Sequence, residues 1–491
     1  MARHTVRVVG DERVGPVEDA PLLAAWAAFR DRSVAPFTIP GHKGRAGSLW
    51  PLLGSVLDGD VPLYGGLDTV KQVAGTLADA EARAGELWGA GWCRFSVGGS
   101  THANQALALA AGSPGDKVLV TRAAHRSTLL GLVLAGLVPV WLPPEVDAGS
   151  GLPLGIAADT LRSAVREHPD ARAVFLVEPS YLGTVSDLPA LVGTAHDAGM
   201  PVLVDQAWAA HFGFHPALPR HALAMGADAL VTSAHKTLPA YSQASLVLAR
   251  TERLDRHRLE RAFEAGHTTS PAGSILASID GARALLAAHG TDLLDRTLAL
   301  VDGARRRLRE LSGVLVPGPE DFGPGRFDPL KLVVVLPGSG ADGIDVEREL
   351  IAGGVPVEMA DRDTVVPIVT LADDTESVSR LVDVLGTAIL AGSGPARPIR
   401  TAVQWAGRAG AAMAPREAFF ARHETVPAVE AVGRACAEVV APYPPGVPVL
   451  IPGEVVTAEL LEALVEARDA GTRIAYAADP ALETLQVIVG S

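Results

Sequence analysis

Short apolar runs alternate with stretches of helical periodicity through the first half of the chain. Between residues 20 and 250, the runs with the pattern of buried strands are 117–121, 138–142, 173–177, 202–205, 229–232 and 244–248. They are short and bounded by turn residues, which favours strands over helices. Strands separated by helical segments are typical of a mostly parallel sheet with helices on both faces. The pattern therefore predicts an α/β fold whose ligands bind at the carboxyl ends of the strands.

Smaller units are predicted beyond this region. Residues 280–310 are rich in alanine, leucine and arginine and predict a long helix. The next unit would hold a strand, a helix and a strand at 331–336, 345–352 and 365–371. Glycine and proline at 391–398 predict a linker, and the proline-rich 442–448 predicts a rigid turn before the apolar 449–451. We expect an N-terminal segment (1–35), a large domain (36–280), a small α/β domain (281–390) and a C-terminal domain (399–491).

Composition narrows the class of protein. The 491 residues are 48% apolar, which is typical of a folded globular chain. The formal charge is −14 and no basic cluster occurs, so we expect no nucleic-acid partner. The longest apolar stretch, 129–144, is interrupted by glycine and proline and is too short for a membrane span. The two cysteines, Cys93 and Cys436, lack metal-ligand spacing, and no secretory segment is apparent, so we expect a cytoplasmic protein.

A lysine and an aspartate stand out at the predicted strand ends. Lys236 lies on the connection between two buried strands, where desolvation would lower its pKa and make it a usable amine nucleophile. Asp205 ends the strand 202–205. Pyridoxal phosphate chemistry needs such a pair, because the lysine holds the aldehyde and the acid keeps the pyridine nitrogen protonated. The alternatives are a solvated loop lysine and an aspartate that caps a helix.

Three further features fit the same cofactor. Gly98, Gly99, Ser100 and Thr101 precede a helical pattern at 105–111, where glycines, hydroxyls and a helix N-terminus could cradle a phosphate. Taken alone, such a turn is an ordinary helix cap. His125 follows the strand 117–121 and could stack on the pyridine ring or deliver a proton, unless it is a polar loop histidine. His235 could bind the phosphate or only pack.

These residues also carry a family resemblance. The motifs are 40–44 (PGHKG), 99–104 (GSTHAN), 125–127 (HRS), 205–211 (DQAWAAH), 233–238 (SAHKTL), 268–271 (TTSP), 442–448 (PYPPGVP) and 452–454 (PGE). In this order they resemble the signature of the bacterial ornithine/lysine/arginine decarboxylases, which have the aspartate aminotransferase fold (fold type I). The resemblance runs from about residue 36 to 480. The length is similar to that of the shorter members, which lack an N-terminal wing domain.

The resemblance implies a role for each matching residue. Lys236 would form the Schiff base with pyridoxal 5'-phosphate, Asp205 would pair with the pyridine nitrogen, and His125 would stack on the ring. The phosphate would be held by Ser100, Thr101, Ser233 and His235, and Ala207 would pack on the ring's other face. Thr269, within 268–270, would reach the cofactor of a neighbouring subunit. The resemblance thus implies a homodimer with shared active sites, which could assemble further.

The substrate end of the site is less well matched. Glu358 corresponds to an acidic position near the substrate side chain, and its alternative is an exposed strand-end glutamate. Shorter members carry a threonine-glutamate pair after an aspartate near residue 60, whereas here Asp60 and Val61 are followed by Pro62 and Leu63. Trp208 replaces the histidine of an Asp-Glu-Ala-His motif and is more like the longer lysine-type enzymes. These departures affect the expected substrate more than the expected fold.

The sequence therefore predicts a pyridoxal phosphate-dependent decarboxylase of a basic L-amino acid, namely lysine, arginine or ornithine. Transamination or side-chain elimination on the same cofactor is the main alternative. Aminotransferases of this fold usually grip the α-carboxylate with an arginine, and the sequence does not show whether Arg362 or another arginine reaches the site. A cofactor-binding regulator without activity is a third possibility.

Overall fold

A seven-stranded sheet forms the centre of the computed structural model, which describes residues 19–31, 57, 59–61, 75–399, 402, 409–443 and 446–490. The motif 40–44, Pro62 and Leu63, and Pro444 and Pro445 of the proline-rich turn lie outside the described residues. The strand order is β1-β9-β8-β7-β6-β2-β3. The strands are β1 (Trp92–Ser96), β2 (Lys117–Thr121), β3 (Val138–Leu142), β6 (Val174–Val177), β7 (Val202–Asp205), β8 (Ala229–Ser233) and β9 (Ser245–Ala249).

The sheet is mostly parallel, as predicted. Strands β3, β2, β6, β7 and β8 run parallel, and β9 is antiparallel to both β8 and β1. Three predicted strands, 117–121, 138–142 and 202–205, match the observed bounds. Strands covered on both faces have near-continuous apolar sequences. This explains why the apolar runs locate them so well.

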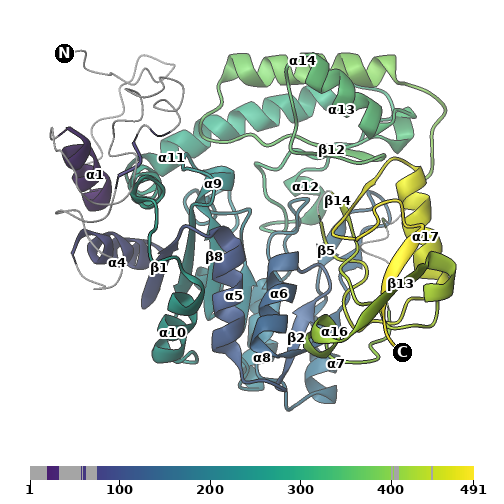
Figure 1. The fold of residues 1–491 in the computed structure, drawn as a ribbon. Coiled ribbons are helices and arrows are strands. Elements are labelled where there is room, and N and C mark those ends of the chain that lie inside the picture. The colour runs from purple at the N-terminus through teal and green to yellow at the C-terminus, as the bar shows by residue number, and fades with distance from the viewer. Residues whose placement is uncertain are drawn as a thin grey trace.

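Helices cover both faces of this sheet (Figure 1). On one face, Val118 and Val120 of β2 share a core with Leu259 and Phe263 of α10. On the other face, Leu119 belongs to the larger core that includes residues of α7 and α8. Neighbouring residues on a strand point to opposite faces, so one strand contributes to both cores. The helices of this region are α4 (Thr76–Trp88), α5 (Gly99–Ala111), α6 (Arg126–Ala135), α7 (Ala158–Glu167), α8 (Leu188–Asp197) and α10 (Arg256–Gly266).

The long helix α11 (Gly273–Arg309) leads from the large sheet to a smaller α/β unit (Figure 1). The small unit has an antiparallel sheet of order β10-β12-β11, covered by α13 and α14. Its elements are β10 (Val334–Val335), α13 (Gly343–Ala352), β11 (Met359–Ala360), β12 (Thr364–Val366) and α14 (Thr375–Ala391). Two predicted strands, 331–336 and 365–371, are shorter than expected. Strand β12 ends before Pro367, which cannot donate a hydrogen bond to the sheet.

The C-terminal segment, residues 409–443 and 446–490, has a core of its own that includes Val440, Leu450 and Leu464. Its elements are α16 (Pro415–Phe420), β13 (His423–Pro427), β14 (Ala441–Tyr443), α17 (Ala458–Asp469), β15 (Arg473–Ala475) and β16 (Thr484–Ile488). The segment lies against the large sheet, because Arg416 donates hydrogen bonds to the carbonyls of Val133 and Leu134 in α6.

Short elements complete the described fold. They are α1 (Pro21–Asp31), β4 (Glu145–Val146), β5 (Pro153–Gly155), α9 (Ala234–Thr237), α12 (Pro319–Phe322) and the 3₁₀ turns Ala222–Met225, Pro337–Ser339 and Ala428–Ala431. None of the helices in the described part of the chain combines the length and apolar character needed to cross a bilayer.

Candidate active site

A cavity of about 690 Å³ opens at the carboxyl ends of β2, β6, β7 and β8. Ten of the residues predicted for the site line it: Ser100, Thr101, His125, Asp205, Ala207, Trp208, Ser233, His235, Lys236 and Glu358. Parallel strands bring their carboxyl ends to one edge, which gathers residues that are far apart in the sequence. Thr269 is exposed in the segment between α10 and α11 and does not line this cavity.

Lys236 lies on the single helical turn α9, directly after β8. Its Nζ lies 4.2 Å from the ring centroid of Trp208. Burial lowers the pKa of Lys236 below its ordinary value, against the opposing charges of Asp205 and Glu358. Because a lower pKa leaves more of the amine unprotonated, the position favours nucleophilic attack on a carbonyl.

Asp205 is the last residue of β7, and its carboxylate is held through both oxygens. Oδ2 accepts a hydrogen bond of 2.7 Å from Asn104 Nδ2, and Oδ1 accepts one of 3.1 Å from the Ala207 amide. Asn104 Nδ2 also donates to Ser127 Oγ at 2.9 Å. Asn104 belongs to the motif 99–104, but no local pattern predicts its contact with Asp205.

His125 caps the N-terminus of α6 and lines the cavity. Its Nδ1 accepts a hydrogen bond from the Ser127 amide at 3.2 Å. This assigns the proton of the neutral ring to Nε2. Burial lowers the pKa of His125, and the positive charges of Lys236 and Arg126 add to this effect while Asp205 opposes it. The site therefore favours a neutral imidazole.

Hydroxyl groups meet at the N-terminus of α5. Ser100 Oγ and Ser233 Oγ are 2.6 Å apart, and the Gly99 amide donates to the Gln243 carbonyl at 3.0 Å. Gly99 has a φ of +66°, which a residue with a side chain rarely adopts. The unpaired amides of a helix N-terminus and adjacent hydroxyls form a surface suited to an anion.

His235 lies beside this anion-binding surface. Its Nδ1 lies 2.8 Å from the Ala244 carbonyl and therefore donates a hydrogen bond to it, so Nε2 does not take part in this contact. Burial lowers the pKa of His235, so without an anion the ring is favoured in its neutral form. His235 thus lines the cavity with one ring nitrogen bound to the backbone.

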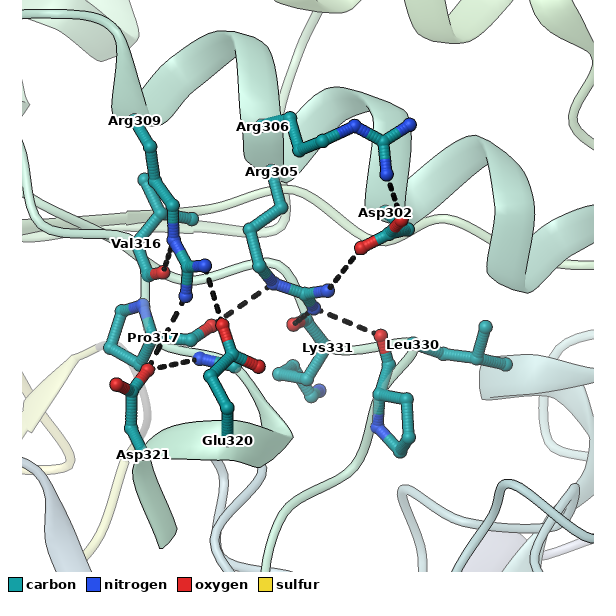
Figure 2. A network of polar contacts seen from close by, with 12 residues as sticks. Asp302, Arg305, Arg306, Arg309, Val316, Pro317, Glu320, Asp321, Leu330 and Lys331 are labelled. Atoms are coloured by element: carbon teal, nitrogen blue, oxygen red, sulfur yellow. Dashed lines mark hydrogen bonds and ion pairs between the residues drawn. The ribbon is translucent and has the colours of Figure 1, made fainter.

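Lys331 is a second lysine at Trp208 that sequence reasoning missed. Its Nζ lies 4.4 Å from the Trp208 ring centroid, and burial lowers the pKa of Lys331 to about 8. Figure 2 shows how α11 holds this segment, where Arg305 donates to the carbonyls of Pro329 and Lys331 at 2.9 and 3.2 Å. The flanking apolar residues, 330 and 332–336, were the one local signal that this lysine is buried.

The predicted substrate residue Glu358 lies just before β11 at the edge of the cavity. It is exposed in this chain, and its Oε1 accepts a hydrogen bond of 3.2 Å from the Tyr181 hydroxyl. The Tyr181 ring packs edge-on against Trp208 with centroids 5.0 Å apart. Glu358 is therefore an exposed glutamate, in keeping with the alternative interpretation of this residue, and it also lines the cavity.

Family models match most of the chain. The Orn/Lys/Arg decarboxylase major domain matches residues 20–317, and the C-terminal domain of the same family matches residues 402–472. The chain belongs to the Orn/Lys/Arg decarboxylase family. The family resemblance drawn from the motifs is thus confirmed.

Relatives within this family match nearly end to end. The chain is 34% identical to an arginine decarboxylase of Bacillus subtilis over 479 residues, which covers 96% of this chain and 98% of that protein. It is also 34% identical to an arginine decarboxylase of Halalkalibacterium halodurans over 482 residues, with the same coverage.

Solved structures support the predicted fold. A lysine decarboxylase of Francisella novicida has a TM-score of 0.79 at 20% identity, covering 96% of this chain and 82% of that one. An alanine–glyoxylate aminotransferase from Nostoc sp. has a TM-score of 0.52 at 20% identity, covering 64% of this chain and 86% of that one. The predicted α/β architecture of fold type I is confirmed.

Proposed function

We propose that this chain decarboxylates a basic L-amino acid with pyridoxal 5'-phosphate as cofactor. The observation that carries the proposal is the placement of Lys236 and the Asn104-bound Asp205 in one cavity at the carboxyl edge of the sheet. End-to-end relatives named arginine decarboxylase support the reaction type.

The residues present fit this cofactor. Lys236 supplies an amine with a lowered pKa, and Asp205 supplies an oriented carboxylate for the pyridine nitrogen. Ser100, Ser233 and the start of α5 supply hydroxyl and amide donors for the phosphate. When bound, the cofactor supplies an electron sink for the α-carbon of the substrate.

The protein's own residues orient the reactants and move a proton. Asn104 and the Ala207 amide hold the Asp205 carboxylate in a fixed direction, so that it stabilises positive charge without reorganising. The neutral His125 presents Nε2–H, while its Nδ1 is engaged at Ser127. Either Lys236 or His125 could return a proton to the α-carbon after carbon dioxide leaves.

Decarboxylation is favoured over transamination by the lining of the cavity. Among the described residues that line it, none is an arginine, and Arg362 is not part of it. An enzyme that releases the α-carboxylate gains nothing from a strong cation that holds it. Incubation of the purified protein with arginine, lysine and ornithine should release carbon dioxide and the matching amine. Formation of a keto acid without carbon dioxide would contradict the proposal.

We also propose that the chain works as a homodimer in which Thr269 approaches the partner subunit's cofactor. The exposure of residues 268–270 in a single chain supports this arrangement. Light scattering on the purified protein should give twice the mass of one chain or a multiple of that value.

A further inference from the structure

The C-terminal segment supplies part of the wall of the cavity. Tyr443, Val447 and Tyr476 line the same space as Lys236. Tyr443 is the last residue of β14 and pairs with Arg473 of β15, and Tyr476 directly follows β15. The two tyrosines therefore lie at the ends of neighbouring strands. A side chain on Gly446, which has a φ of +83°, would lie 3.2 Å from the Tyr443 ring and 3.7 Å from the Tyr476 hydroxyl. Gly446, in the connection between β14 and α17, thus lies next to both tyrosines.

Tyr476 adopts a backbone conformation that side chains disfavour. Its φ is +67°, in the left-handed region. Among the described non-glycine residues, three have positive φ, namely Gln243, Tyr476 and Leu482, and the first two line the cavity. Such conformations persist where the surroundings fix them, and they gather at functional sites.

A cation already lies against the Tyr476 ring. The Arg126 guanidinium is 4.4 Å from the ring centroid, and Arg126 directly follows His125 at the start of α6. Arg126 Nε is buried and has no hydrogen-bond partner among the described residues. The Tyr476 ring is thus held against this guanidinium, which fixes Tyr476 relative to the start of α6 beside His125.

A buried ion pair holds the C-terminal segment in place beside the site. Arg122, directly after β2, lies 3.0 Å from Glu454 and donates to the Val449 carbonyl at 2.8 Å. Both charged side chains are buried, so removing either partner would leave an unpaired charge in the interior. The Arg126–Tyr476 contact and the Arg122–Glu454 ion pair thus both hold the C-terminal segment beside the cavity.

We propose that Tyr443 and Tyr476 are specificity-determining residues that select a substrate with a guanidinium side chain over one with an ammonium. The inference rests on the proposed decarboxylase function. A guanidinium is planar, weakly hydrated and stacks on aromatic faces, whereas an ammonium is a compact and strongly hydrated point charge. Glu358 and Tyr181 lie on the same cavity and offer the acceptor that such a cation needs. Arginine is accordingly the preferred substrate.

The test is the ratio of kcat/KM for arginine to that for lysine in the holoenzyme. Tyr476→Gly removes the ring at a position whose left-handed backbone glycine adopts without strain. Tyr443→Ala removes the other ring. Each should lower the ratio roughly two- to thirty-fold, the range of one cation–π contact. Tyr476→Phe and Tyr443→Phe keep the rings and should keep the ratio. If Tyr476→Gly does not fold, Tyr476→Asn decides the same question, since asparagine tolerates left-handed backbone.

Phe420→Ala is the matched control. Phe420 lies in the same C-terminal segment, is exposed like the two tyrosines and also contacts an arginine, Arg416, at 5.2 Å, but it does not line the cavity. Its ratio should equal that of the wild type. An unchanged ratio in both ring-removing variants, an equal fall in Phe420→Ala, or a wild-type preference for lysine would each overturn the inference while the decarboxylase function stands. Absence of carbon dioxide from all three basic amino acids would overturn both.

Discussion

Asn104 donates a 2.7 Å hydrogen bond to Asp205 across two elements that are far apart in the sequence, α5 and β7. Both residues are buried, so this contact fixes the direction of the carboxylate. A hydrogen bond to a charged acceptor is worth more than one between neutral groups, typically about 1.5–3 kcal/mol. Asn104 therefore acts as a positioning residue for the acid that we assign to the pyridine nitrogen.

Replacing Asp205 tests that assignment directly. Asp205→Ala should bind pyridoxal phosphate more weakly and lose on the order of a hundredfold or more in turnover, because a preorganised electrostatic partner is gone. Asn104→Ala keeps the carboxylate and should lose less. Steady-state carbon dioxide release and cofactor titration measure the two effects. Turnover of Asp205→Ala within a few-fold of the wild type would make Asp205 a structural carboxylate.

Labelling tests which lysine carries the cofactor. Lys236 is one of five lysines in the chain, so reduction of the holoenzyme with borohydride followed by peptide mapping gives an unambiguous answer. We expect the pyridoxyl label on Lys236, because it lies in the cavity and burial lowers the pKa of its amine. Lys331, over the same indole, is the internal comparison. A label on Lys43, Lys117 or Lys331 would contradict the mechanism.

The sequence predicts the position of Lys236 in the site but not that of Lys331. Lys236 and Asp205 were predictable because Asp205 ends, and Lys236 closely follows, a strand buried on both faces. Such strands have continuous apolar runs that turn residues delimit. The ordered motifs then gave the family, and with it the fold.

The far side of the site could not be predicted in the same way. Lys331 contacts Trp208 and Tyr476 lines the cavity because the small unit and the C-terminal segment pack near the large sheet, and no local periodicity encodes that packing. The motif 442–448 indicated a turn, but not that Tyr443 would line the site. Glu358 was placed by resemblance alone, and the structure adds its contact with Tyr181.

Glu358 is expected to help to bind the cationic side chain of the substrate. Glu358→Gln removes the negative charge at the cavity edge and should raise the Michaelis constant for the basic substrate several-fold, with little change in cofactor affinity. The effect should be moderate because Glu358 is exposed and solvent screens its charge. Initial-rate kinetics over a range of substrate concentrations measure it.

Two variants control for this result. Glu349→Gln changes an exposed glutamate on α13 outside the cavity lining and should leave the Michaelis constant unchanged. Tyr181→Phe removes the hydroxyl that donates to Glu358 but keeps the charge, so it should have the smaller effect. Equal Michaelis constants for Glu358→Gln and the wild type would remove Glu358 from the substrate site.

Lys331 is expected to make stability depend on alkaline pH. In the folded chain burial lowers the pKa of Lys331 to about 8 from an ordinary value of 10.5. Between these values the unfolded chain binds more protons than the folded chain, so the contribution of Lys331 to stability rises with pH from 8 to 10.5. It is lost again as the pH falls through 8. The full change is on the order of 3 kcal/mol.

Lys331→Met should abolish this contribution. Urea unfolding of the apo-protein at pH 7.5, 8.5 and 9.5 should show that the free energy of unfolding of the wild type rises at each step relative to that of Lys331→Met. The reason is that only the wild type has a buried ammonium that loses its proton over this range. Lys117→Met is the control, since the Lys117 side chain is 41% exposed, and its difference from the wild type should stay constant over this range. A constant difference for Lys331→Met as well would mean that Lys331 keeps its proton in the folded chain throughout, and that Trp208 and Asp328 stabilise its ammonium fully.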